Sequence, residues 1–181
     1  MFTPDTAYRH SSMADAAQIA ACVARARVGD SAAWAALHTI YRPVLHAVAL
    51  AHGPPEAAED VVQEAFARGM ERLDRLHTDD AFGGWLCTIA RNLATDGYRR
   101  RSRFAVLRDV FFARSRPTVE ASQALQAIQG LPETYRELMM MRLVEQLTGP
   151  EIAERLGRPV GSVRVSLHRG MALLRDALGD E

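Results

Sequence analysis

The chain contains 181 residues, of which 48% are hydrophobic, and its acidic and basic residues balance to a net charge of zero. This hydrophobic content is enough for one ordinary domain or two small domains with packed cores, and it argues against a disordered tail. No apolar run approaches the roughly 20 residues of a membrane-spanning helix, and residues 1–13 lack the apolar core of a signal peptide. We therefore expect a cytoplasmic protein without membrane insertion.

The charges are segregated along the chain, and no group of side chains suggests catalysis or metal binding. Acidic residues predominate from residue 56 to residue 80, and arginines predominate from residue 99 to residue 116. The histidines are scattered, and Cys22 and Cys87 form no Cys-x-x-Cys motif or His/Cys cluster. We expect no enzyme activity, no cofactor and no metal site, and we interpret both cysteines as buried small hydrophobic residues.

Apolar residues recur at intervals of three and four, and the alternation typical of strands is absent, which predicts an all-α fold. The first helix is expected over residues 14–28. Asp30 or Ser31 then caps a second helix that runs to about residue 50, and Pro43 either kinks or divides it.

A third helix is expected over residues 57–76, with an apolar stripe and a polar side. The stripe consists of Val62, Phe66, Met70 and Leu73. The polar side includes Asp60, Gln63, Glu64 and Arg68. Phosphate would repel these carboxylates, so they suit a basic protein partner better than DNA. Taken by itself, this side also fits an ordinary solvated helix face.

A loop over residues 77–84 precedes a fourth helix, expected over residues 85–101. Trp85, Ile89 and Leu93 share its apolar side, so Trp85 is expected to pack in the core. The periodicity weakens after this helix, and a proline interrupts the next stretch. This places a linker between two domains at residues 104–119.

The C-terminal region has the local signals of a helix-turn-helix motif. Thr148 and Glu151 form a capping box for a helix over residues 149–156. Gly157 supplies a left-handed position that ends this helix, and Pro159 opens the next one. The inward residues of the second helix are expected to be Val163, Leu167, Leu174 and Leu178. Its polar residues are Ser162, Arg164, Ser166, His168 and Arg169. Because the second helix of such a motif enters the major groove, we expect a DNA-binding protein.

Three segments of the chain carry a family resemblance when they are taken together. The first is Ala-Glu-Asp-Val-Val-Gln-Glu-Ala-Phe at residues 58–66. The second is Trp-Leu-Cys-Thr-Ile-Ala-Arg-Asn-Leu-Ala-Thr-Asp at residues 85–96, followed by three arginines. The third is the helix-turn-helix with its supporting helix, at residues 131–174. In this order and spacing they resemble the bacterial RNA polymerase sigma factors of the extracytoplasmic-function (ECF) group.

The resemblance implies an alternative sigma factor made of two small helical domains. The expected divisions are a flexible N-terminus at 1–13, sigma domain two at 14–103, the linker at 104–119 and sigma domain four at 120–181. In the family, the segment that contains Asp60, Gln63 and Glu64 binds the clamp of the largest polymerase subunit. The expected partners are core RNA polymerase, at its clamp and flap region, promoter DNA, and an anti-sigma factor. The expected role is transcription initiation at a stress or envelope-response regulon under anti-sigma control.

For the minus-ten promoter element, the resemblance implies that domain two captures an unpaired base. Its pocket would be formed by Asn92 and the loop residues Asp79, Asp80, Ala81 and Phe82. Phe82 and Tyr98 are candidates for stacking on bases. The expected phosphate contacts are Arg99, Arg100, Arg101 and Arg103.

For the minus-thirty-five element, the resemblance implies contacts from the second helix of the motif. Its candidates are Ser162, Arg164, Ser166, His168 and Arg169. The chain departs from the family at Val165, Ser166, Gly170 and Met171, so two arginines of the usual pattern are missing. A glycine inside a helix also costs about 1 kcal/mol relative to alanine. We expect weaker DNA affinity than in a typical relative, or an unusual promoter. In the fourth helix, which resembles the promoter-melting helix of the family, Gly83, Gly84 and Gly97 are expected to loosen the helix in the same way.

Two further segments suggest contacts. The apolar residues of the linker are Phe104, Val106, Leu107, Val110, Phe111 and Phe112. In the family, the corresponding segment runs toward the polymerase active site. In this chain the segment could equally fold as an amphipathic helix or be covered by an inhibitory partner. The methionines at 139–141 could form an adaptable partner surface, although core packing is favoured.

Two other functions are compatible with parts of the sequence. The first is a sigma-like mimic that titrates an anti-sigma protein without initiating transcription. The second is a stand-alone helix-turn-helix regulator that binds duplex DNA without polymerase. The second alternative leaves Asp60, Gln63, Glu64 and the helix around Asn92 without a role.

Overall fold

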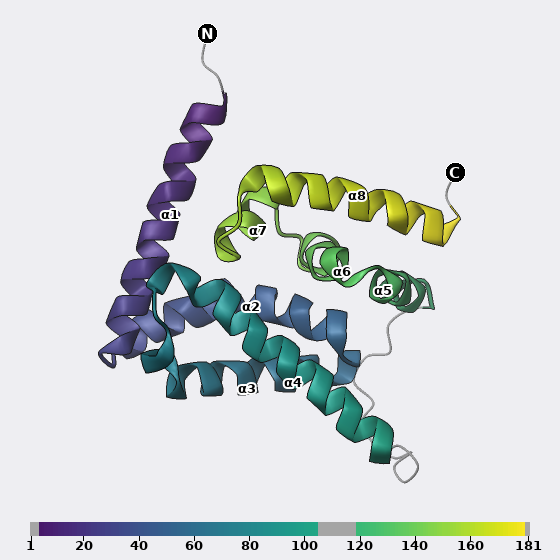
Figure 1. Cartoon of the computed structure of the whole chain (residues 1–181), viewed down its shortest axis with the longest axis horizontal. Coiled ribbons are helices and arrows are strands. Elements are labelled where there is room, and N and C mark those ends of the chain that lie inside the picture. The colour runs from purple at the N-terminus through teal and green to yellow at the C-terminus, as the bar shows by residue number, and fades with distance from the viewer. Residues whose placement is uncertain (1–3, 105–118, 180–181) are drawn as a thin grey trace.

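The computed structural model describes residues 4–104 and 119–179, with side chains at 16–96 and 123–179 (Figure 1). All secondary structure in these ranges is helical, which confirms the expected all-α class. None of the described helices combines the length and the apolar run that crossing a bilayer requires. The linker residues 105–118 lie outside the described ranges.

The described part of the N-terminal unit contains four α-helices, joined in part by short 3₁₀ turns. They are α1 (Pro4–Arg27), α2 (Ser31–His52), α3 (Ala58–Glu71) and α4 (Phe82–Phe104). Asp30 caps α2 by accepting hydrogen bonds from the backbone nitrogens of Ala32 and Ala33, at 2.9 and 3.1 Å. Pro43 lies inside α2 and does not divide it. The first helix begins at Pro4 rather than at residue 14.

Helix α2 is the centre of this unit, because α1, α3 and α4 all pack against it. Its side chains Leu37, Val44 and Leu45 are completely buried. An aromatic cluster joins α2 to α4, in which the ring centroid of Phe82 lies 5.1 Å from that of Tyr41 and 6.1 Å from that of Trp34. These edge-on contacts anchor the N-terminal end of α4 to the core.

The C-terminal unit consists of four helices and one π-helical segment. They are α5 (Val119–Gly130), α6 (Glu133–Met139), the π-helical segment η4 (Met140–Val144), α7 (Gly149–Arg155) and α8 (Val160–Leu178). Met139, Met140 and Met141 are all completely buried, so core packing of the methionine run is confirmed. The chain changes from α to π winding at Met140, and α2 of the N-terminal unit covers this segment on one side. Both units therefore contribute to burying the three methionines.

The two units pack directly on each other. Helices α5, α6, α7 and η4 lie against α2, and α7 also contacts α1 (Figure 1). The buried side chains of both units form one continuous hydrophobic cluster, from Val23 in α1 to Leu174 in α8. The described structure is therefore a closed arrangement in which neither unit stands apart from the other.

Some expected core positions are wrong. Met70 is 60% exposed, because α3 ends at Glu71 and is followed by the short 3₁₀ turn η2 (Leu73–Arg75). Leu178 is 48% exposed, because it is the last residue of α8. Both residues fit the apolar spacing, but each lies in the final turn of its helix.

Candidate polymerase and promoter interfaces

The expected polymerase-binding residues lie together on the outer side of α3. Asp60, Gln63 and Glu64 are all exposed. Figure 1 shows α3 on the side of the N-terminal unit that faces away from α5 to α8. The Gln63 amide donates to Glu59 Oε1 at 3.1 Å, and Arg68 Nε donates to Glu64 Oε1 at 2.7 Å. The closed arrangement thus leaves this acidic face open to a partner.

The loop before α4 is held in place by an arginine from α1. Arg27 donates to the backbone oxygens of Leu73 and Leu76, and its Nη2 lies 2.6 Å from Asp79 Oδ1. Asp80 is exposed, within the 3₁₀ turn η3 (Asp79–Ala81). Of the two predicted loop aspartates, Asp79 is therefore engaged in an ion pair and Asp80 faces solvent.

The structure corrects the expectation for Phe82. Its side chain is completely buried among Trp34, Tyr41 and Trp85, so it cannot stack on a base in this conformation. The physical reason is its position at the first turn of α4, where the ring closes the aromatic cluster. Trp85 is half-buried and packs against the same core, which confirms its expected packing role.

The remaining minus-ten candidates lie further along α4. Asn92 is exposed on this helix. The backbone of α4 continues through the positions of the other candidates, whose side chains lie outside the described ranges: Tyr98, Arg99, Arg100, Arg101 and Arg103. Their DNA contacts remain predictions.

The helix-turn-helix has the local geometry that its sequence predicts. The Thr148 backbone nitrogen donates to Glu151 Oε2 at 2.7 Å, and the Glu151 nitrogen donates to Thr148 Oγ1 at 3.4 Å, which completes the capping box. The Thr148 hydroxyl also donates to Glu151 Oε2 at 2.6 Å, and this hydrogen bond together with the one from the Thr148 backbone nitrogen lowers the pKa of the Glu151 carboxyl. Gly157 has a φ of 62°, so the turn uses the left-handed conformation that glycine adopts without strain.

Helix α8 directs its apolar residues inward and most of the candidate DNA contacts outward. Val163 is completely buried and Leu174 is 6% exposed. The exposed candidates are Ser162, Arg164, His168 and Arg169, whereas Ser166 is half-buried. The polar side of α8, which a helix-turn-helix is expected to place in the major groove, is therefore largely exposed to solvent in the closed arrangement.

Gly170 has a packing explanation. It is buried, and a Cβ at this position would lie 2.9 Å from Met139 Sδ and 3.2 Å from Tyr135 Cβ. Glycine therefore allows α8 to approach α6 closely. This departure from the family pattern is explained by helix packing, and its effect on DNA affinity remains untested.

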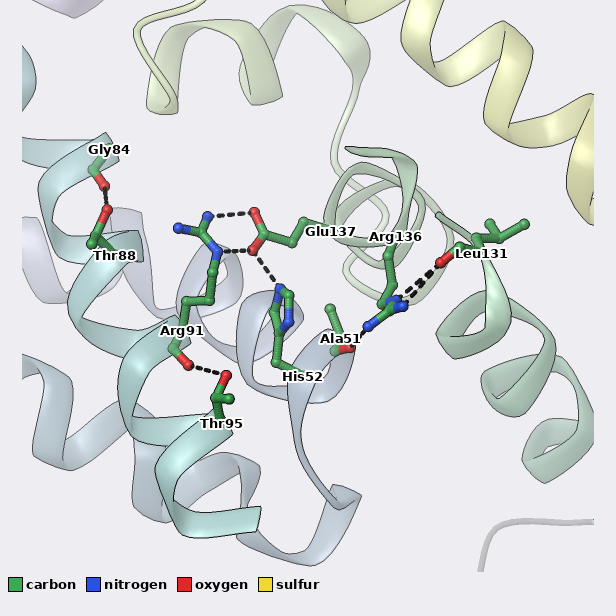
Figure 2. Close-up of polar contacts among 9 residues, drawn as sticks. All are labelled: Ala51, His52, Gly84, Thr88, Arg91, Thr95, Leu131, Arg136 and Glu137. Atoms are coloured by element: carbon green, nitrogen blue, oxygen red, sulfur yellow. Dashed lines mark hydrogen bonds and ion pairs between the residues drawn. The ribbon is translucent and has the colours of Figure 1, made fainter. Parts of the chain in front are cut away.

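A cluster of polar contacts between the two units was not anticipated from the sequence. Glu137 of α6 accepts hydrogen bonds from Arg91 of α4, at 2.7 Å from Nε to Oε1 and 2.9 Å from Nη2 to Oε2 (Figure 2). Its Oε1 also lies 2.7 Å from His52 Nε2 at the end of α2. Because an ionised carboxylate only accepts hydrogen bonds, His52 Nε2 carries the donated hydrogen.

The electrostatics of this cluster favour the ionised carboxylate. Burial acts to raise the pKa of Glu137, but hydrogen bonds from His52 and Arg91 together with the Arg91 charge hold it below its ordinary value. The hydrogen bonds to Glu137 also raise the pKa of the Arg91 guanidinium. The side chain of Glu137 is 15% exposed, so solvent screens the contact only partly.

Two side chains of the C-terminal unit donate hydrogen bonds to backbone carbonyls in the last turn of α2. Gln129 Nε2 donates to the backbone oxygen of Leu50 at 2.7 Å, and Arg136 Nη1 donates to that of Ala51 at 3.4 Å. These carbonyls belong to the last turn of α2, where intrahelical donors are lacking. A second side-chain pair joins His46 Nδ1 to Glu145 Oε1 at 2.6 Å.

The two units approach each other closely at Gly83. A Cβ at this position would lie 1.9 Å from the backbone oxygen of Arg155, the last residue of α7. The negative end of the α7 dipole thus faces the first turn of α4, where the dipole is positive. From its sequence Gly83 is expected to loosen α4, but in the structure it permits close packing against α7.

Comparisons with known proteins identify the family. The family model described as Sigma-70 region 2 matches residues 37–104, and the one described as Sigma-70, region 4 matches residues 121–174. The ECF RNA polymerase sigma factor SigW of Bacillus subtilis is 29% identical over 179 residues, covering 87% of this chain and 95% of that protein.

Two further relatives agree with this assignment. The RNA polymerase sigma-H factor of Pseudomonas aeruginosa is 33% identical over 143 residues, covering 68% of this chain and 74% of that protein. The solved structure of CnrH in complex with the cytosolic domain of CnrY has the same fold, with a TM-score of 0.60 and 24% identity, and covers 90% of this chain and 98% of that chain. The chain belongs to the sigma-70 family of RNA polymerase sigma factors and, within it, to the ECF group.

Proposed function

We propose that this ECF sigma factor binds core RNA polymerase through the outer side of α3 and directs it to promoters through α4 and α8. The observation that carries the proposal is the arrangement of exposed polar residues in a chain that matches both sigma regions in order. The acidic face of α3 and the polar side of α8 are both exposed, on different units of the molecule.

Polymerase binding is assigned to Asp60, Gln63 and Glu64. Two carboxylates and an amide on one helix face complement a basic protein surface, whereas DNA phosphates would repel them. In this proposal the face docks on the clamp of the largest polymerase subunit. The C-terminal unit supplies the second contact, to the polymerase flap region.

Promoter recognition is divided between two helices. Asn92, together with Asp79 and Asp80, would receive the unpaired base of the minus-ten element, and the Arg99 to Arg103 region would contact phosphates. Helix α8 would enter the major groove of the minus-thirty-five element, with Arg164 and Arg169 at phosphates or guanines. Capture of a base at Phe82 would require the aromatic cluster to open.

The proposed cellular role follows from the family. The protein would act in the cytoplasm as a non-catalytic initiation factor, because the polymerase performs the chemistry. An anti-sigma protein would restrain it until a stress or envelope signal releases it.

Run-off transcription tests the proposal. Purified core RNA polymerase and the sigma factor are combined with DNA from upstream of the protein's own gene. Discrete transcripts are expected, and Asp60→Ala or Asn92→Ala should abolish them. Asp74→Ala is the matched control for Asp60, because it removes an exposed carboxylate just beyond α3.

The outcomes separate the alternatives. Transcripts that survive Asp60→Ala would contradict the assignment of the α3 face. Polymerase binding without transcripts would favour a mimic that occupies an anti-sigma protein. A chain that does not bind polymerase at all would overturn the proposed function.

A further inference from the structure

The contact between Arg91 and Glu137 lies beside the proposed minus-ten site. Arg91 directly precedes the exposed Asn92 on α4, and its guanidinium is paired with both carboxylate oxygens of Glu137 (Figure 2). His52, from the end of α2, reaches the same oxygen as Arg91 Nε. A carboxylate of the C-terminal unit therefore occupies a site formed by two residues, Arg91 and His52, that both belong to the N-terminal unit.

The site formed by Arg91 and His52 has the chemistry of a phosphate site. A guanidinium presents parallel N–H groups that fit a carboxylate or a phosphate equally, and an imidazole N–H adds a third donor. When the units separate, Glu137 leaves with α6, and Arg91 and His52 remain without it. A phosphodiester is the anion that promoter DNA brings to the same helix.

Promoter binding requires the units to separate. A compact globular chain of this length has a radius of gyration of about 16 Å, equivalent to a sphere about 40 Å across. By their positions, the minus-ten and minus-thirty-five elements lie about 25 base pairs apart, or roughly 85 Å of B-DNA at 3.4 Å per base pair. The closed arrangement cannot contact both elements, so Glu137 cannot remain on Arg91 while α4 and α8 both bind.

We propose that Arg91 and His52 form a binding site for a DNA backbone phosphate near the minus-ten element, and that Glu137 masks this site in the closed protein. Glu137 thereby competes with promoter DNA inside the same chain. This inference rests on the proposed function, because it requires α4 to contact DNA. It adds a contact site and an internal competitor to that function.

A fork-junction DNA with one unpaired minus-ten strand, taken from upstream of the protein's own gene, is the probe. Its affinity for the full chain is measured by fluorescence anisotropy over a series of salt concentrations. Glu137→Gln should raise the affinity about tenfold, because a charge-assisted competitor is lost. Adding Arg91→Gln to this variant should remove the gain and lower the salt dependence by about one phosphate contact.

The matched control is Glu133→Gln. Glu133 lies one turn earlier on α6 and is exposed, so this change removes the same charge from the same helix. Only a small effect on affinity is expected. An equal gain in both variants would mean that net charge is responsible, and it would overturn the masking role of Glu137.

Cys87 reports separation of the units independently. It lies on α4 midway between Gly83 and Arg91, at steps of four, so it shares the side that contacts the C-terminal unit. It is 2% exposed, and burial raises the pKa of its thiol to about 12. In a Cys22→Ser background, which removes the half-buried second thiol, Glu137→Gln should accelerate labelling of Cys87 by a thiol reagent.

The results separate failure of the inference from failure of the proposed function. An unchanged affinity and an unchanged labelling rate in Glu137→Gln would overturn the inference, even if polymerase binds and transcripts form. A gain in affinity that persists after Arg91→Gln would also overturn it. Failure of the wild-type chain to bind polymerase would overturn the function, whatever the anisotropy shows.

Discussion

The two helices proposed to contact promoter DNA differ in how much of their polar surface is available. On α8, Ser162, Arg164, His168 and Arg169 are exposed. On α4, Glu137 holds Arg91 and the aromatic cluster buries Phe82. The two cases have different causes, because Glu137 of the C-terminal unit pairs with Arg91, whereas Phe82 is buried by Trp34, Tyr41 and Trp85 of the N-terminal unit itself. Packing of the two units thus engages Arg91 on α4, while Asn92 and the polar side of α8 stay exposed.

The largest effect is expected from a substitution that forces the two units apart. Gly83→Ala places a Cβ within 1.9 Å of a backbone oxygen of α7, which cannot move without shifting that helix. We expect the closed arrangement to lose about 3 kcal/mol or more. Urea unfolding, small-angle X-ray scattering and Cys87 labelling would measure the loss of stability and of compactness.

Gly84→Ala is the control for this substitution. A Cβ at Gly84 meets no atom within 4 Å, although the residue is next in the same helix. It should leave compactness unchanged and raise helix stability slightly. Equal behaviour of the two variants would show that the contact between α4 and α7 does not hold the units together.

A smaller effect is expected from the exposed surface of α8. Arg164→Ala should weaken promoter binding by the polymerase holoenzyme by about 2 kcal/mol and leave protein stability unchanged, because the side chain is exposed in the free protein and is proposed to contact DNA. Filter binding of the holoenzyme to promoter DNA with altered minus-thirty-five sequences would measure this loss of affinity. Arg175→Ala, exposed in the last turn of the same helix, should have little effect. Equal losses in both variants would indicate a general charge effect.

Acidification should weaken the contact that Glu137 makes with Arg91 and His52. His52 of α2 and Arg91 of α4 face Glu137, and its pKa is lowered from 4.5 in the closed arrangement. The resulting stabilisation is fully present above pH 4.5 and is lost as the pH falls through the lowered pKa, where the carboxyl becomes protonated. Scattering measured from pH 7 to pH 3.5 should show the units separating at the acidic end. In Glu137→Gln this acid-induced separation of the units should be absent. An identical pH profile in the wild type and in Glu137→Gln would contradict the assignment of the effect to Glu137.

The smallest effect is expected at the glycine that the family pattern does not explain. Gly170→Ala gains helix propensity of about 1 kcal/mol, but the new methyl group crowds Met139 and Tyr135. We expect the two effects to cancel to within about 1 kcal/mol. Gly161→Ala in the same helix meets no atom within 4 Å and should stabilise the protein. Thermal unfolding of both variants would measure the two effects. Equal stabilisation by Gly170→Ala and Gly161→Ala would exclude crowding at Gly170.

The helices and the helix-turn-helix could be predicted because their signals are local. Asp30, Thr148, Glu151 and Gly157 cap or end helices through contacts with residues at most a few positions away. Boundaries were less accurate where local signals are weak. Helix α3 ends at Glu71 rather than at residue 76, because the chain turns there into η2.

The contacts between the units could not be predicted in the same way. Glu137 is 46 residues from Arg91 and 85 residues from His52, and each of the three fits an exposed position on its own helix. The available signals were the place of Arg91 beside Asn92 and the glycine at the start of α4. Neither signal identifies the residue of the C-terminal unit that makes the contact.

The sequence by itself determined the all-α class, the helix-turn-helix and the family, because periodicity, caps and motif order are properties of neighbouring residues. The tertiary structure decided that Phe82 is buried, that Gly83 and Gly170 permit close helix approach, and that Glu137 holds Arg91. These properties depend on which distant helices meet and at what separation. Helix packing within each unit and between the two units sets that separation, and no local pattern along the chain encodes it.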